Sequence, residues 1–160
     1  MTPLEPETID RICRDMTGDG FPPGDLASLR RLRADALDPL TLWRNLVRWG
    51  VDPRGDAEVA GWADTLALLA SAPEVHQRGR HLGQALAEAG VSEARLLRLL
   101  RAEGDAFAAQ ARSVLHLLAS SGESADLSFL AELRFALSPQ RREHICRNIA
   151  SNYYRHKPKE

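Results

Sequence analysis

Residues 81–100 read HLGQALAEAGVSEARLLRLL and hold the clearest helical signals in the chain. Apolar residues recur at helical spacing on one face of the first half, at Leu82, Ala85, Leu86 and Ala89. Gly90 follows at the position where a left-handed residue commonly ends a helix. Ser92 is a suitable N-cap for a second helix, which we expect to stop at Gly104. The segment therefore predicts two consecutive helices joined by a short turn.

The same periodicity continues through nearly the whole chain, without alternating strand patterns or Asn-Gly hairpin signals. We predict an all-α protein of about eight or nine short helices, arranged as one compact bundle or as two helical sub-bundles. The first helix is expected from Pro3, with Thr2 as its cap, and the second is expected to extend to about Asp35, with Asp25 as its cap. The further expected N-caps are Asp38, Asp105, Asp126 and Ser138.

Apolar stripes indicate which helix faces are buried. In the helix expected after Pro39, one face carries Leu40, Trp43, Leu46 and Val47. The next helix carries Val59, Trp62, Ala63, Leu66 and Leu69 on one face. Pro73 and Gly79 predict a loop or broken helix over residues 71–80. That segment is the expected seam between an N-terminal half, 1–80, and a C-terminal half, 81–160.

Composition narrows the class of protein. Cys13 and Cys146 fit no paired motif, and no signal peptide or long apolar segment is present, so we expect a cytoplasmic protein outside the membrane. The five histidines do not combine with other residues into a metal-binding spacing, and no nucleophile or phosphate-loop motif occurs. We therefore expect no enzyme activity, no metal and no cofactor.

Basic residues are unevenly placed. The chain has a formal net charge of −1, yet residues 141–160 hold six Lys or Arg and two acids, which gives that segment a charge of +4. Arginine accounts for 19 of the 21 basic residues, and its guanidinium binds phosphate in a bidentate manner. Cations at a helix C-terminus also suit the helix dipole, and a GC-rich genome also enriches arginine. Charge alone leaves these alternatives open.

A helical wheel of residues 92–103 places three arginines on one face. Arg95, Arg98 and Arg101 follow one another at intervals of about 60° on the wheel, and no acid of the same helix lies beside them. A face that serves only solubility usually mixes both signs. In the last helix, Arg141, Asn148 and Arg155 form a polar line, while Ile145, Ile149 and Tyr153 are expected to face the core. Tyr154 lies on a different face.

Three stretches resemble the CasB family, the small subunit of the type I-E CRISPR effector complex Cascade. The first runs from Gly24 to Arg31 (GDLASLRR), with Pro39 and Trp43 after it. The second is residues 81–100, and the third is the C-terminal helix that ends in Tyr153 and Tyr154. The order and spacing of these stretches agree with the family over nearly the whole chain.

The resemblance implies a non-catalytic, all-α subunit that is present in two copies. Its implied partners are the other Cascade subunits, a second copy of itself, the guide RNA and the target DNA. It implies a role in steadying the RNA–DNA hybrid and the displaced non-target strand. Arg30, Arg31, Arg95 and Arg98 lie in matched motifs; Arg101, Arg141, Arg142, Arg147 and Arg155 are inferred as nucleic-acid contacts from charge and face. A helical protein–protein adaptor without nucleic-acid contact is the alternative, and it predicts that acids of a neighbouring helix or partner close the Arg95 face.

Overall fold

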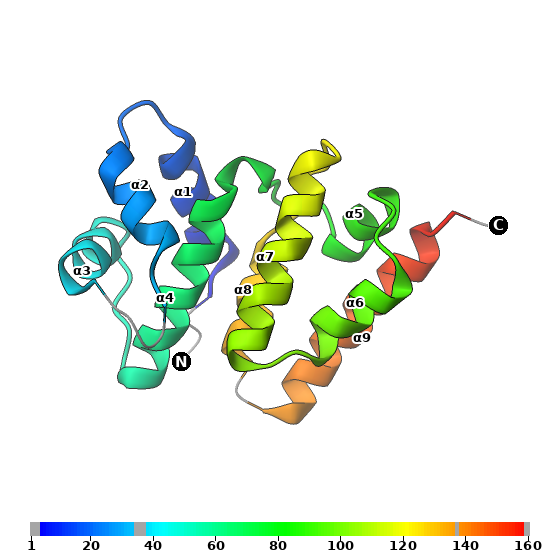
Figure 1. Ribbon diagram of the computed structural model, residues 1–160. Coiled ribbons are helices and arrows are strands. Elements are labelled where there is room, and N and C mark those ends of the chain that lie inside the picture. The colour runs from blue at the N-terminus through cyan, green and yellow to red at the C-terminus, as the bar shows by residue number, and fades with distance from the viewer. Residues whose placement is uncertain (1–3, 34–37, 137, 159–160) are drawn as a thin grey trace. The chain divides into compact units, whose positions relative to one another are not determined.

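The computed structural model describes residues 4–33, 38–136 and 138–158 and confirms the all-α class. Nine α-helices, one 3₁₀ turn and no strand occur within these residues (Figure 1). The helices are α1 (Pro6–Thr17), α2 (Pro23–Arg30), α3 (Pro39–Arg48), α4 (Asp56–Ser71), α5 (Leu82–Glu88), α6 (Glu93–Arg101), α7 (Gly104–Ser120), α8 (Ser128–Phe135) and α9 (Pro139–His156). Thr2, Pro3 and Asp35, which were expected at helix ends, lie outside the described residues.

The starts of these helices follow local rules. Proline is the first residue of α1, α2, α3 and α9, where its missing N–H costs no helical hydrogen bond. Three expected N-caps are confirmed, because the side chains of Asp38, Ser92 and Ser138 accept backbone N–H groups. Three expected N-caps are wrong: Pro22 precedes α2, whose first turn contains Asp25, Glu103 precedes α7, and Leu127 precedes α8.

Asp126 has a different role from the expected cap. Its carboxylate accepts the N–H and the hydroxyl of Ser128, at 3.1 and 2.6 Å, and the N–H of Gly79 at 3.0 Å. It thereby joins the start of α8 to the loop before α5. As expected, residues 71–80 contain no long helix, only the end of α4, the 3₁₀ turn Pro73–Val75 and that loop. The loop is fixed further by backbone hydrogen bonds between Ala125 and both Val75 and Gln77.

The first of two compact units, Met1–Glu74, contains α1 to α4. In it α1 and α2 pack against α4, and α3 packs against α2. The predicted stripe of α4 is confirmed, since Trp62, Ala63, Leu66 and Leu69 are buried and Val59 is half-buried. Ile9, Ile12, Leu29, Leu42 and Leu46 complete this core.

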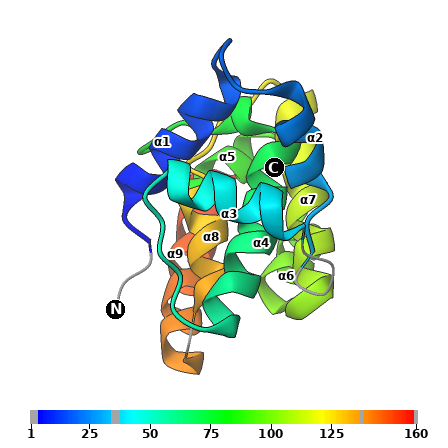
Figure 2. The same cartoon turned by 90° about the vertical axis from the view of Figure 1, so that its left-hand side faces the viewer.

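The prediction for the buried face of α3 is wrong. Leu40, Trp43 and Val47 are 77%, 41% and 74% exposed, and only Leu46 of the predicted stripe is buried. The buried face instead carries Leu42, Asn45 and Leu46, with Trp49 just beyond the helix end. Figure 2 shows α3 in the foreground. The helix therefore presents an apolar stripe, Leu40–Trp43–Val47, to solvent.

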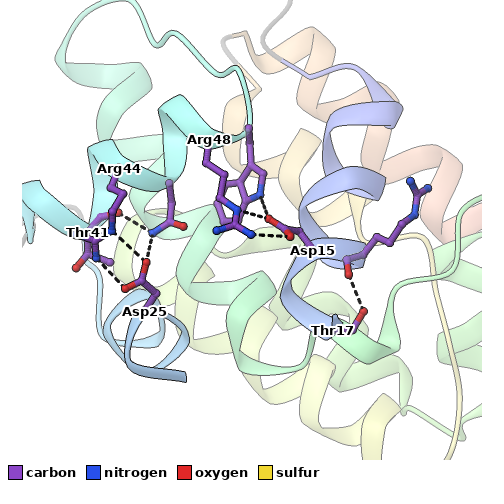
Figure 3. A network of polar contacts seen from close by, with 9 residues as sticks. Asp15, Thr17, Asp25, Thr41, Arg44 and Arg48 are labelled. Carbon is purple, nitrogen blue, oxygen red and sulfur yellow. Dashed lines mark hydrogen bonds and ion pairs between the residues drawn. The ribbon is translucent and has the colours of Figure 1, made fainter. Parts of the chain in front are cut away.

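Two carboxylates, one from α1 and one from α2, bind the polar side chains that border the buried face of α3 (Figure 3). Asp15 accepts hydrogen bonds from Arg48 Nε at 2.6 Å and from the Trp49 indole at 2.7 Å. Asp25 accepts two from Arg44, at 2.7 and 3.2 Å. The arginine hydrogen bonds lower the pKa of both carboxyl groups below the usual range, against the effect of burial. These contacts fix Arg44, Arg48 and Trp49 toward α1 and α2, which leaves Trp43 outside.

The second unit, Val75–Glu160, contains α5 to α9. Its main contact is between α5 and α9, and α7 packs on both α5 and α6. The apolar faces predicted for α7 and α9 are confirmed, since Phe107, Ala111, Val114, Leu115 and Leu118 are buried, as are Ile145, Ile149 and Tyr153. The Tyr153 hydroxyl donates to the carbonyl of Val91 at 2.6 Å, which ties α9 to the turn before α6.

Candidate nucleic-acid interface

The outward side of α6 carries an unusual pair of arginines. Leu96 and Leu99 are buried, which turns Arg98 and Arg101 toward solvent, where both are exposed. Neither guanidinium has a carboxylate partner within the described part of the chain. Arg95 is half-buried at the edge of this side, and its Nη1 donates to the Ser113 hydroxyl on α7 at 3.2 Å. We call Arg95, Arg98 and Arg101 the α6 arginines.

Most other arginines with resolved partners are neutralised. Carboxylates lie within ion-pair distance of the guanidinium in at least six of them: Arg14 with Asp10, Arg44 with Asp25, Arg48 with Asp15, Arg80 with Glu88 and Glu123, Arg141 with Glu132, and Arg147 with Glu143. Pairing of this kind lowers the local positive potential that an anion would meet. Because Arg98 and Arg101 lack such a partner among the described residues, the positive potential around them is not lowered in this way.

Two predicted contact residues hold helix ends together. Arg142 donates to the carbonyls of Leu133, Leu100 and Ala102, at 3.2, 3.3 and 2.6 Å, and lies over the Phe107 ring. Arg30 donates from Nε to the carbonyl of Ala70, at 2.8 Å, in the last turn of α4. The last carbonyls of a helix lack intrahelical partners and carry partial negative charge, so a guanidinium satisfies both needs. The structure thus gives Arg30 and Arg142 a structural role.

The remaining predicted contact residues differ in whether a carboxylate lies near the guanidinium. Arg141 lies 4.0 Å from Glu132, whose pKa is raised by burial although Arg141 opposes that change. Arg147 pairs with Glu143 one turn away at 2.9 Å. Arg155 on α9 and Arg31, directly after α2, are exposed. Arg30 and Arg31 belong to the first unit, and all the other candidates belong to the second.

Arg112 is not among the contact residues predicted from charge and helix face. Arg112 is exposed on α7. It directly precedes Ser113, whose hydroxyl accepts the hydrogen bond from Arg95. Its position on the face opposite the buried Ala111 and Val114 is the signal that could have identified it.

α6 and α9 lie side by side and run antiparallel. Lys157 Nζ is 2.6 Å from a Glu93 carboxylate oxygen at one end. At the other end, Arg142 and the Cys146 thiol both approach the carbonyl of Leu100. Tyr153 is buried as predicted, and its ring meets that of Tyr154 edge to face with centroids 5.2 Å apart. Tyr154 is 56% exposed.

Neither a metal-binding cluster nor a membrane-spanning helix occurs among the described residues. Among them, no cluster of three or more His, Cys, Asp or Glu side chains could hold a metal ion. Within the same ranges, no helix has the length and apolar character needed to cross a membrane.

Comparisons with known proteins identify the family. The model of the family described as CRISPR-associated protein Cse2 matches residues 25–154. CasB from Thermus thermophilus is 26% identical, with a TM-score of 0.70 over 96% of this chain and 99% of that chain. No curated protein matches.

Two further structures share the fold at lower identity. CasB from Thermobifida fusca is 20% identical, with a TM-score of 0.70 over 93% of this chain and 97% of that chain. A chain of E. coli Cascade bound to a PAM-containing dsDNA target is 22% identical, with a TM-score of 0.67 over 91% and 96%. The predicted resemblance to the CasB small subunit is thereby confirmed, and the chain belongs to the CRISPR-associated protein Cse2 family.

Proposed function

We propose that this protein is a non-catalytic small subunit of a type I-E Cascade ribonucleoprotein. In that particle it contacts nucleic-acid backbone through arginine side chains and stabilises both the guide RNA–target DNA hybrid and the displaced non-target strand. Its partners are the guide RNA, the target DNA, the other Cascade subunits and a second copy of itself. The family match and the solved E. coli Cascade with its dsDNA target support this assignment.

One observation carries the nucleic-acid part of the proposal. Arg98 and Arg101 are exposed on successive turns of α6 without a carboxylate partner among the described residues, in a chain whose net charge is −1. Guanidinium groups in this state bind phosphate oxygens without first breaking an ion pair. Because the whole chain is slightly acidic, its affinity for nucleic acid outside the particle is expected to be weak.

The physical effect of such contacts is large enough to matter. Replacing a DNA duplex by an RNA–DNA hybrid is close to energetically balanced, so a few phosphate contacts to the separated strands favour the open state. The contacts carry no sequence information, because phosphates are the same at every position. They are sensitive to salt, because each neutralised phosphate releases counterions.

The test is the double variant Arg98→Glu/Arg101→Glu in the assembled particle. Retention of a labelled displaced strand is measured between about 50 and 200 mM salt. We expect weaker retention and a shallower slope of log affinity against log salt, by about one for each lost contact. The control is Arg14→Glu/Arg54→Glu, which makes the same change in charge at two exposed arginines of the first unit. Equal loss in both variants, or an unchanged slope in the first, contradicts the proposal.

The second candidate function, a protein–protein adaptor, is favoured by the exposed stripe on α3. Leu40, Trp43 and Val47 place aromatic and aliphatic surface in water, which is typical of sites that meet another protein. As an adaptor, the subunit would use this stripe against another Cascade subunit. The variant Leu40→Ser/Val47→Ser would then reduce co-purification with the particle, while Arg98→Glu/Arg101→Glu would have no effect on strand retention. The reverse result excludes the adaptor function as the sole role.

A further inference from the structure

We propose that Tyr154 is a stacking platform for one unpaired base of the strand whose phosphates contact the α6 arginines. The inference rests on the proposed function and extends it from the backbone of the strand to its bases. The ligand is therefore single-stranded nucleic acid. Inside a duplex both faces of each base are already covered by neighbouring bases, so a protein ring has no face to meet.

The ring of Tyr154 is held in place by its neighbour. Tyr153 is 1% exposed, and its hydroxyl donates to the carbonyl of Val91 at 2.6 Å. The two tyrosine rings meet at an interplanar angle of 85° with centroids 5.2 Å apart. An exposed ring that packs on a fixed one loses little conformational freedom when a ligand binds, which favours stacking.

Tyr154 lies near the start of α6, the helix that carries Arg98 and Arg101, because Tyr153 beside it bonds to Val91 and Lys157 pairs with Glu93. Glu93 is the first residue of α6, and its pKa is lowered first by the hydrogen bond from Lys157 and also by one from Tyr154. Arg98 and Arg101 follow Glu93 by five and eight residues, which is a distance of about 7.5 and 12 Å along the helix axis. Leu97 is 47% exposed and lies one helical turn after Glu93 and one before Arg101, so α6 carries apolar surface between these two positions.

The nearby acid does not repel a strand strongly. The Glu93 carboxylate is 2.6 Å from Lys157 Nζ, so the pair is close to neutral. The site therefore combines a positioned aromatic ring, an apolar side chain and two open guanidinium groups. Proteins that bind single strands without sequence preference combine the same groups, because every base has a π-face and every nucleotide a phosphate.

The first experiment compares Tyr154→Ala with Tyr154→Phe in the assembled particle. Retention of the displaced strand is measured as for the arginine variants. We expect Tyr154→Ala to weaken retention by about 5- to 100-fold with an unchanged salt slope, because stacking involves no counterion release. Tyr154→Phe keeps the ring and should stay within about twofold of the natural protein. Equal loss in both variants, or no loss in Tyr154→Ala, overturns the inference.

The second experiment removes the bases from the strand. On a displaced strand with consecutive abasic sites, Tyr154→Ala and the natural protein should bind alike, because no base is left to stack. A loss of the same size on the abasic strand means that the ring acts through the fold, and the inference fails. If Arg98→Glu/Arg101→Glu changes the salt slope while Tyr154→Ala is silent, only the stacking inference fails. If the arginine variant is silent, the proposed function fails first.

Discussion

Gly83 is the residue on which the contact between α5 and α9 depends. A Cβ atom at this position would lie 2.3 Å from the carbonyl oxygen of Ile149, 2.8 Å from the backbone nitrogen of Tyr153 and 2.9 Å from the Cβ of Asn152. None of these atoms can move by a change of side-chain rotamer. Gly83→Ala must therefore push the two helices apart.

The size of the effect follows from these distances. Ordinary contact begins at 3.4 Å, so the helices must separate by about 1 Å at this crossing. Forcing extra volume into a packed core costs about 1–3 kcal/mol, and a backbone that must shift belongs at the upper end of that range. Alanine favours a helix over glycine by about 1 kcal/mol, which offsets part of the cost. We expect a net loss of about 2 kcal/mol, or a Tm lower by about 4–8 °C.

Thermal unfolding followed by circular dichroism measures this loss. The matched control is Gly24→Ala in α2, where no atom lies within 4 Å of the added Cβ and the backbone φ suits any residue. The control should keep or raise the Tm, by up to about 4 °C. If Gly83→Ala melts at or above the natural protein, the two helices are not held at the distance described, and the reasoning is refuted.

Three further predictions concern stability. Leu99→Ala should lower the free energy of unfolding in urea by about 2–5 kcal/mol, because the side chain is completely buried. Tyr153→Phe should cost about 1–3 kcal/mol in the same assay, because the buried Val91 carbonyl loses its donor. Asp15 has a folded pKa below 3.8, chiefly through its hydrogen bond from Arg48, so its contribution is present above pH 3.8 and is lost as the pH falls through the folded value. Asp15→Asn should therefore flatten the decline of stability in acid, and parallel curves for the two proteins would contradict this.

Helix starts could be predicted from the sequence because capping is local. Asp38, Ser92 and Ser138 each accept an N–H only three residues away, so the pattern that predicts the cap also contains its partner. Asp126 shows the limit of this rule. Its oxygens also meet the N–H of Gly79, 47 residues earlier, and no local pattern reveals that contact.

The face of α3 could not be predicted because periodicity permits two answers. Leu42 and Leu46 are one helical turn apart, as are Trp43 and Val47, so each pair marks an apolar face. The face that is buried, with Leu42 and Leu46, is the one bordered by Arg48 and Trp49, which bond to Asp15 on another helix. The sequence of one helix does not contain such contacts with its neighbours.

In the candidate site too, features set within one helix could be predicted, whereas contacts between distant residues could not. Periodicity correctly places Arg98 and Arg101 on the exposed side of α6, because the buried Leu96 and Leu99 fix the orientation of that helix. It cannot show that Arg142 turns toward the carbonyls of Leu100 and Ala102, some 40 residues earlier. Formal charge alone therefore overstates the cationic surface of α9.

Arg98 has no carboxylate partner among the described residues, and its sequence neighbours explain why. The positions four residues before and after Arg98 hold Ala94 and Ala102, and the positions three residues away hold Arg95 and Arg101. Elsewhere an acid occupies the pairing position, as Glu143 does for Arg147. Like charges at this spacing destabilise an isolated helix by a few tenths of a kcal/mol. A phosphate bound between these arginines would replace the repulsion by attraction. The row of arginines that slightly destabilises the free subunit would then stabilise the particle with nucleic acid bound.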